Sequence, residues 1–186
     1  KELNLFSLPF FFEDTQALDA VVQGKAGEQI FARLTQLGVR PLAWGENGYR
    51  QLTNSQRDIA SPADLHDLKI RVVGSKLFID TFKALGANPT PMNFGEVYSA
   101  LQQGVIDGQE NPLSLIDTQR FHEVQKYLTL SGHIFTVYTP VISKAFFESL
   151  PEDQQQLIQQ SMDQAIAYDR ELVAAEDADH LARIQE

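Results

Sequence analysis

The chain contains no cysteine among its 186 residues. Disulfides, thiol nucleophiles and cysteine-based zinc sites are therefore excluded for this sequence. The lack of thiols fits an oxidising compartment as well as a reducing one, so cysteine usage leaves the compartment open.

Basic residues are also scarce, because 25 acidic residues outnumber 15 basic ones and the formal net charge is -10. Binding to a phosphate backbone depends on clustered Lys and Arg that release counterions. We therefore expect no nucleic-acid partner.

Long apolar runs are missing too, and Lys1 is not followed by the basic and apolar regions of a signal peptide. We expect a soluble mature chain or a fragment. The hydrophobic content of 43% is enough for the core of one large domain or two small lobes.

Recognised catalytic and cofactor motifs are absent from the sequence. It has no G-x-x-x-x-G-K phosphate loop, no G-x-G-x-x-G turn and no G-x-S-x-G elbow. The four histidines are scattered, and His122-Glu123 lacks the second histidine of a metalloprotease helix. We expect neither a cofactor nor a metal site.

The pattern of apolar residues predicts alternating helices and strands, which is typical of an α/β fold with parallel βαβ units. A helical pattern follows Glu13–Thr15 and is expected to end at Gly38. Further helices are expected to begin at Ser61, Ser75, Asn93 and Pro151. Strands are expected at 39–44, 68–73, 105–106, 127–130 and 135–143, with a polar connection at 50–60. The last helix has no Gly or Pro between 152 and 186, so it should lie across a large body or span two lobes.

Residues 107–111, D-G-Q-E-N, offer two carboxylates and two carboxamides where a loop needs far fewer polar groups. Asp107 and Glu110 could form the acid pair of a carbohydrate-acting hydrolase. The order of residues departs from the D-x-D-x-D-G calcium loop. Asn111 precedes Pro112 and serves either as a turn cap or as an extended carboxamide.

Two arginines are candidate anion receptors. Arg71 interrupts the apolar strand LKIRVV, where alternation places it beside Lys69 and favours a half-solvated, ion-paired position. Arg50 stands alone in NGYRQLTN. A guanidinium can hold a carboxylate through two parallel hydrogen bonds, which lysine cannot reproduce. Phe94 is either a core contact or the wall of a cleft.

Four motifs occur in order along the chain and together resemble one family. They are NGYRQLTN, LKIRV, LGANPTPMNFGEVYSALQQGVIDGQENP and EVQKYL. From about Leu8 to the final helix, the sequence resembles the solute-binding proteins of tripartite ATP-independent periplasmic (TRAP) transporters, the DctP-like group. The resemblance implies a two-lobed flytrap fold with a long helix that spans both lobes.

The resemblance also implies a division of the chain. Residues 1–48 would form part of lobe I, 49–137 lobe II, 138–150 a return to lobe I and 151–186 the spanning helix. A complete family member has a further first-lobe segment before the residues that match Leu8, and more chain after the long helix.

Ligand contacts implied by the resemblance are Arg71 gripping a carboxylate, Arg50 as a second arginine, Phe94 covering the ligand and Asn111 as a polar contact. Asp107, Gln109 and Glu110 would be mainly architectural. The implied function is a monomeric periplasmic receptor that binds a C4-dicarboxylate, a sugar acid or a similar carboxylate and delivers it to membrane permease subunits. The alternatives are the hydrolase and a sensor domain of the same fold.

Overall fold

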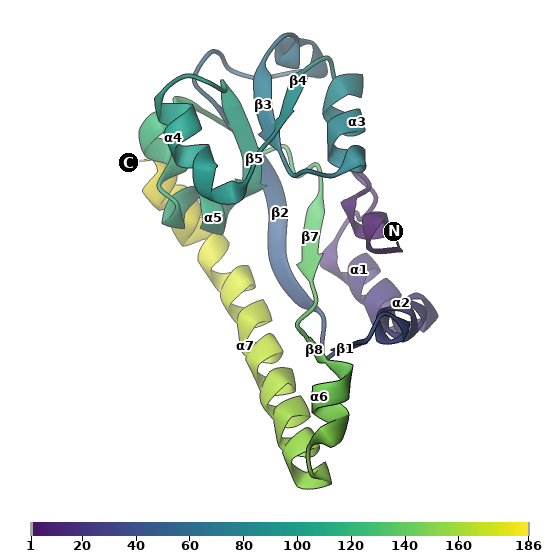
Figure 1. Cartoon of the computed structure of the whole chain (residues 1–186). Helices are drawn as coiled ribbons and strands as arrows, with labels where there is room; N and C mark the ends of the chain where they lie inside the picture. Colours follow the sequence, from purple (N-terminus) through teal and green to yellow (C-terminus); the bar gives the residue numbers. More distant parts are fainter. Residues whose placement is uncertain (1, 186) are drawn as a thin grey trace.

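The computed structural model describes residues 2–185 and has an α/β architecture (Figure 1). Its α-helices are α1 (Thr15–Val22), α2 (Lys25–Gln36), α3 (Lys76–Ala84), α4 (Val97–Gln102), α5 (Leu113–Thr118), α6 (Lys144–Ser149) and α7 (Glu152–Gln185). Short 3-10 helices are η1 (Glu2–Ser7), η2 (Pro62–Leu65), η3 (Phe94–Glu96) and η4 (Phe121–Val124). The strands are β1 (Val39–Pro41), β2 (Gly45–Asn54), β3 (Lys69–Val72), β4 (Asn88–Pro91), β5 (Gly108–Pro112), β6 (Tyr127–Thr129), β7 (Phe135–Tyr138) and β8 (Val141–Ser143).

The larger sheet has the strand order β4-β3-β5-β2-β6, and β7 also pairs with β2. Strand β3 is parallel to β4 and β5, whereas β2 is antiparallel to β5, β6 and β7. The α/β class is confirmed, but the expectation of a parallel sheet holds only for β3, β4 and β5. The sheet is mixed because β2 enters it in the opposite direction, between β5 and β6.

A second, two-stranded sheet of β1 and β8 lies at the other end of the molecule, beside α2 and α6 (Figure 1). The long strand β2, strand β7 and helix α7 run between this end and the larger sheet (Figure 1). Helix α7 has 34 residues, which corresponds to about 51 Å at 1.5 Å per residue. The prediction of one long helix is confirmed as far as Gln185, and Glu186 lies outside the described residues.

Three clusters of buried apolar side chains hold these layers together. The first lies between α3, η2 and one face of the larger sheet and includes Leu65, Ile70 and Phe82. The second lies between the opposite face and α4, α5 and η4, and the end of α7 packs against it through Leu181 and Ile184. The third joins η1, α1, α2 and β7. The larger sheet is therefore covered on both faces.

Local signals account for several helix ends. The side chain of Asp14 accepts a hydrogen bond from Ala17 N at 2.8 Å and caps α1. Ser61 and Asp64 form a reciprocal capping box at η2. Gly38 has a φ of +86°, the left-handed conformation that glycine adopts readily after a helix.

The segment D-G-Q-E-N is not the expected loop. Gly108–Pro112 forms β5, all five residues are buried, and Val105 and Ile106 lie outside any strand. The prediction was wrong because neighbouring strands supply partners for these polar side chains, which periodicity along one strand cannot reveal. Residues 50–54, expected to begin a polar connection, likewise complete β2.

Two other strand expectations were too long. The strand expected at 39–44 stops at Pro41, and the one expected at 135–143 divides into β7 and β8 on either side of Thr139-Pro140. Proline lacks the N–H that a sheet requires. Asn93 makes no side-chain cap to the helix that it precedes, which begins as η3 and continues as α4.

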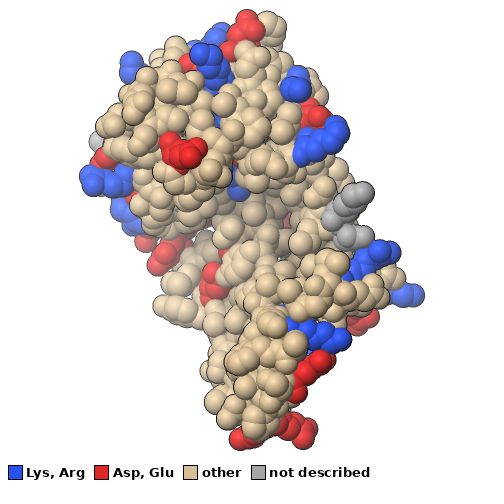
Figure 2. Space-filling model, viewed as in Figure 1, with Lys and Arg blue, Asp and Glu red and all other residues tan. Residues whose placement is uncertain are grey.

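Charged side chains of both signs are scattered over the face shown in Figure 2, with no continuous basic patch in that view. Among the helices of residues 2–185, none combines the length and apolar character needed to span a membrane.

Substitution of Gly108 tests the tight packing of β5 against β2. A Cβ at this position would lie 2.2 Å from the backbone oxygen of Thr53, which cannot move without disturbing the sheet. We expect Gly108→Ala to lower the free energy of unfolding, measured with urea, by about 2 kcal/mol or more. Gly95→Ala is the control, because no atom lies within 4 Å of its added Cβ. Equal stability of the two variants would contradict this account of β5.

Candidate functional site

The three predicted polar site residues lie on adjacent strands of the larger sheet. Arg71 in β3 is paired with Gln109 in β5. Asn111 in β5 is paired with Gln51 in β2, one residue from Arg50. The fold thus brings together residues that are up to 61 positions apart in sequence.

Arg50 is buried and held by a carboxylate. It donates to both carboxylate oxygens of Glu110, through Nε to Oε2 and through Nη2 to Oε1, the latter at 3.0 Å. Nη2 also donates to the backbone oxygen of Glu110 at 2.7 Å and to Asn111 Oδ1 at 3.0 Å. The charge of Arg50 is therefore largely neutralised inside the protein.

Glu110 is fully buried and joins Arg50 to His133, whose Nε2 lies 3.2 Å from Glu110 Oε2. Burial raises the pKa of Glu110, but Arg50 and His133 lower it by more, so the net shift is downward. A general acid of a glycosidase needs a raised pKa.

Asp107 is also committed to structure. Its Oδ2 accepts from Lys69 N at 2.8 Å, and its Oδ1 accepts from Gln56 Nε2 at 2.9 Å. The geometry therefore does not favour the alternative of an acid pair formed by Asp107 and Glu110.

Arg71 differs from Arg50 because no carboxylate of residues 3–185 forms an ion pair with it. Its Nε and Nη2 both donate to the backbone oxygen of Met92, at 3.2 and 2.9 Å. Only 4% of Arg71 is exposed. Burial lowers the pKa of the guanidinium, Glu110 raises it and Arg50 lowers it, with a net decrease. Arginine nevertheless stays charged.

The expectation that Arg71 is half-solvated and ion-paired was wrong. Strand β3 lies between β4 and β5, and of its four residues only Lys69 is exposed. Alternation along one strand identifies its two faces, but it does not show that both of them are covered.

Phe94 is 37% exposed, so it is not the core contact that was one of its two expected roles. The guanidinium carbon of Arg71 lies 5.8 Å from the centre of the Phe94 ring, within the range of cation–π contacts. The ring meets Phe121 edge-on at 6.0 Å. A partly exposed aromatic ring therefore lies beside a buried cation.

Asn111 is a strand residue rather than a turn cap. Its Oδ1 accepts from Arg50, and its Nδ2 donates to Gln109 Oε1 at 2.5 Å. The extended geometry expected before Pro112 is observed.

Phe78 and Thr136 also adjoin this group, and the sequence did not single them out. Arg50 Cζ lies 5.4 Å from the Phe78 ring centre, and Arg50 Nη1 lies 3.4 Å from Thr136 Oγ1. Both residues line a hollow of about 220 Å³ together with Val73 and Ser75 near α3 and Trp44 and Tyr138 near the small sheet. Phe78 had only the helical spacing of a core residue, and Thr136 had no distinguishing signal.

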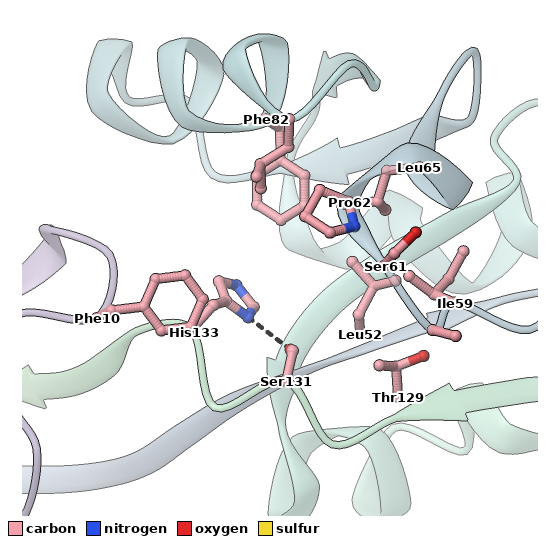
Figure 3. Close-up of a pocket in the computed structure, with 12 residues that line it drawn as sticks. Phe10, Leu52, Ile59, Ser61, Pro62, Leu65, Phe82, Thr129, Ser131 and His133 are labelled. Carbon is pink, nitrogen blue, oxygen red and sulfur yellow. Dashed lines mark hydrogen bonds between the residues drawn. The ribbon is translucent and has the colours of Figure 1, made fainter.

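A second hollow, of about 210 Å³, lies between α3, η2 and the end of β6 (Figure 3). Its lining is mainly apolar and includes Phe10, Pro62 and Phe82 (Figure 3). His133 also lines it, with Nδ1 2.8 Å from Ser131 Oγ. None of the four predicted ligand contacts lines either hollow.

Metal ligation has no support in the part of the chain that the structure describes. No group of three or more His, Asp or Glu side chains there is arranged to hold an ion.

Substitution of Glu110 tests how much its ion pair with Arg50 stabilises the protein. Its pKa is lower in the folded than in the unfolded state, so its ion pair stabilises the protein fully above the unfolded value of about 4.3. This contribution is lost as the pH falls through the folded value. We expect Glu110→Gln to cost about 3 kcal/mol or more at pH 7 by leaving Arg50 without a carboxylate. The variant should also lose less stability than the unmodified protein between pH 7 and pH 3.5 in urea unfolding. Equal losses over that range would refute this role.

The family model of the bacterial extracellular solute-binding proteins, family 7 (DctP), matches residues 1–186. Among curated proteins, the 2,3-diketo-L-gulonate-binding periplasmic protein YiaO of Escherichia coli (strain K12) is 42% identical over 172 residues. That match covers 92% of this chain and 52% of YiaO.

Solved structures agree with this match. The sugar acid binding protein DctPAm of Advenella mimigardefordensis, in complex with galactonate, has a TM-score of 0.95 at 38% identity and covers 99% of this chain. A TRAP periplasmic solute binding protein of Sulfurospirillum deleyianum, with bound succinate, has a TM-score of 0.94 at 40% identity, again over 99% of this chain. This chain covers 59% of each of those two chains.

The chain thus spans about half the length of the curated relatives that it matches. Its α/β fold is that of the corresponding part of the TRAP periplasmic solute-binding proteins, which are receptors rather than enzymes. The protein belongs to family 7 of the bacterial extracellular solute-binding proteins, the DctP family.

Proposed function

We propose that this chain is part of an extracytoplasmic receptor that captures a small organic acid. The observation that carries the proposal is Arg71, a buried guanidinium that forms no ion pair with any carboxylate of residues 3–185. Burying a charge without a counter-ion is costly, and a bound carboxylate would supply the missing partner. Galactonate and succinate, found in the two similar structures, both carry carboxylates.

In this proposal the ligand is bound by three residues with different roles, Arg71, Asn111 and Phe94. Arg71 grips the carboxylate, Asn111 adds a polar contact and Phe94 covers the ligand. Arg50 adds a second, weaker contact through Nη1, because Glu110 already holds its Nε and Nη2. Further contacts would come from the part of the relatives that this chain does not span, so a C4-dicarboxylate and a sugar acid both remain in the proposal.

We propose that residues 1–48 and 138–150 belong to one lobe, residues 49–137 to the other, and residues 151–186 to a helix that spans both. The courses of β2, β7 and α7 between the two ends of the molecule support this division (Figure 1). Closure of the lobes would bury the ion pair between ligand and arginine in a drier environment, where charge-assisted hydrogen bonds are stronger.

In the same proposal the receptor is a periplasmic monomer. It needs no cofactor and delivers its ligand to the membrane permease subunits of a TRAP transporter. Family membership supports the transport role, because TRAP solute-binding proteins act outside the cytoplasm.

A melting screen of the full-length protein against organic acids, including galactonate, succinate and 2,3-diketo-L-gulonate, tests the proposed function. Ligand that binds only the folded state stabilises it by about 2.7 kcal/mol at a hundred times Kd. We expect the bound acid to raise Tm by about 5 °C or more. A flat screen would overturn the receptor assignment.

Arg71→Lys tests the guanidinium fork. The lysine keeps the charge but cannot make two parallel bonds, so we expect the affinity measured by calorimetry to fall about tenfold to hundredfold, and further in Arg71→Ala. Arg57→Lys is the control, because Arg57 is exposed and its guanidinium donates a long bond, of 3.4 Å, to His66 O. Unchanged affinity in Arg71→Lys and Arg71→Ala would remove Arg71 from the site.

A further inference from the structure

We propose that Gln109 is a positioning residue for acid binding and that it acts by holding the carboxamide of Asn111 in one orientation. This inference rests on the proposed function, since it assigns Asn111 a specific part in that function. Gln109 has 0% exposure and is enclosed by β2 and β3 on either side of β5. Its carboxamide is bonded to Asn111 and Thr53 inside the sheet, so it acts on a ligand through Asn111.

The orientation of Asn111 is set first by Arg50. A guanidinium can only donate hydrogen bonds, so the Asn111 atom 3.0 Å from Arg50 Nη2 must be the oxygen Oδ1. The other end of the carboxamide is then Nδ2. It donates to Gln109, which must accept with Oε1, at 2.5 Å. Arg50 and Gln109 together hold both ends of the Asn111 carboxamide.

The same reasoning determines the next two bonds. With Oε1 used as the acceptor, Gln109 Nε2 donates to Thr53 Oγ1 at 2.9 Å. The Thr53 hydroxyl then donates to Gln125 Oε1, also at 2.9 Å. Gln125 Nε2 ends the chain by donating to backbone oxygens, that of Val124 at 3.0 Å and that of Asp107 at 3.4 Å.

Every link points the same way, from the charge of Arg50 to the backbone oxygens of Val124 and Asp107. Asn111 and Gln109 are both buried, so reversing either amide would leave a donor facing a donor away from water. The direction of the whole chain is therefore determined by Arg50, whose guanidinium can only donate.

Asn111 carries two N–H bonds, and Gln109 takes one of them. The second is the donor that Asn111 can offer to a carboxylate, in the same group of strands as Arg71. Gln109 in β5 is also the strand partner of Arg71 in β3. The residue that holds the Asn111 amide therefore lies opposite the residue that carries the guanidinium. Loss of Gln109 would free the amide to rotate about its bond to Arg50.

The test compares the same substitution at the two ends of the chain in the full-length protein. Gln109→Met removes the bond to Asn111, whereas Gln125→Met breaks the far end and leaves that bond intact. With galactonate and succinate as probes in calorimetry, we expect Kd to rise about tenfold in Gln109→Met and by less than about twofold in Gln125→Met. In an Asn111→Ala background, Gln109→Met should add less than about twofold, because its target is gone.

Equal losses in the two Met variants, or an undiminished effect of Gln109→Met in the Asn111→Ala background, would overturn the positioning role and leave the receptor function standing. Failure of the unmodified protein to bind either acid would overturn this inference as stated. A flat result across the wider acid screen would overturn the receptor function as well.

Nuclear magnetic resonance of the unmodified protein gives a second measurement if Gln109→Met does not fold. One Nδ2 proton of Asn111 should exchange slowly, and the other should shift when a bound acid is added. Two protons with equal exchange rates, or no shift on binding, would overturn the proposal.

Discussion

The ion pair between Arg50 and Glu110 is the interaction on which the centre of the larger sheet depends. It places two opposite charges between β2 and β5, where both side chains are buried. Such a pair adds little net stability compared with apolar residues, but removing one partner leaves a buried charge that is costly. The pair therefore specifies how β2 and β5 meet more than it strengthens their contact.

This ion pair explains why Arg50 and Arg71 differ in their capacity to bind an anion. Arg50 uses Nε and Nη2 on Glu110 and Asn111, whereas Arg71 uses Nε and Nη2 on one backbone oxygen. The cluster of Arg50, Arg71 and Glu110 keeps an excess of positive charge in a site with little water. A carboxylate is the simplest group that can balance such an excess.

The polar side chains of β5 follow from the same constraint. A buried strand carrying Gln109, Glu110 and Asn111 is stable only if each polar atom has a partner, and β2 supplies partners for all three. The two carboxamides bond directly, Asn111 Nδ2 donating to Gln109 Oε1, and Gln109 Nε2 donates in turn to Thr53 of β2. What looks like a decorated loop in the sequence is a hydrogen-bonded core strand.

Sequence alone determined the elements whose causes are local. The long helix after Pro151, the glycine stop at Gly38 and the capping box at Ser61 were readable because each depends on neighbouring residues and on the periodicity of apolar positions. The family was readable from four motifs, since their order does not require knowledge of their contacts.

Only the tertiary structure decided which polar residues are buried and what satisfies them. β5 was mistaken for a loop and Arg71 for a half-solvated residue, because burial depends on strands and helices distant in sequence. Arg50 is already neutralised and Arg71 has no acid partner among residues 3–185, and this difference depends on where Glu110 lies. A single strand cannot reveal that position, because hydrogen bonds across a sheet join residues about 60 positions apart.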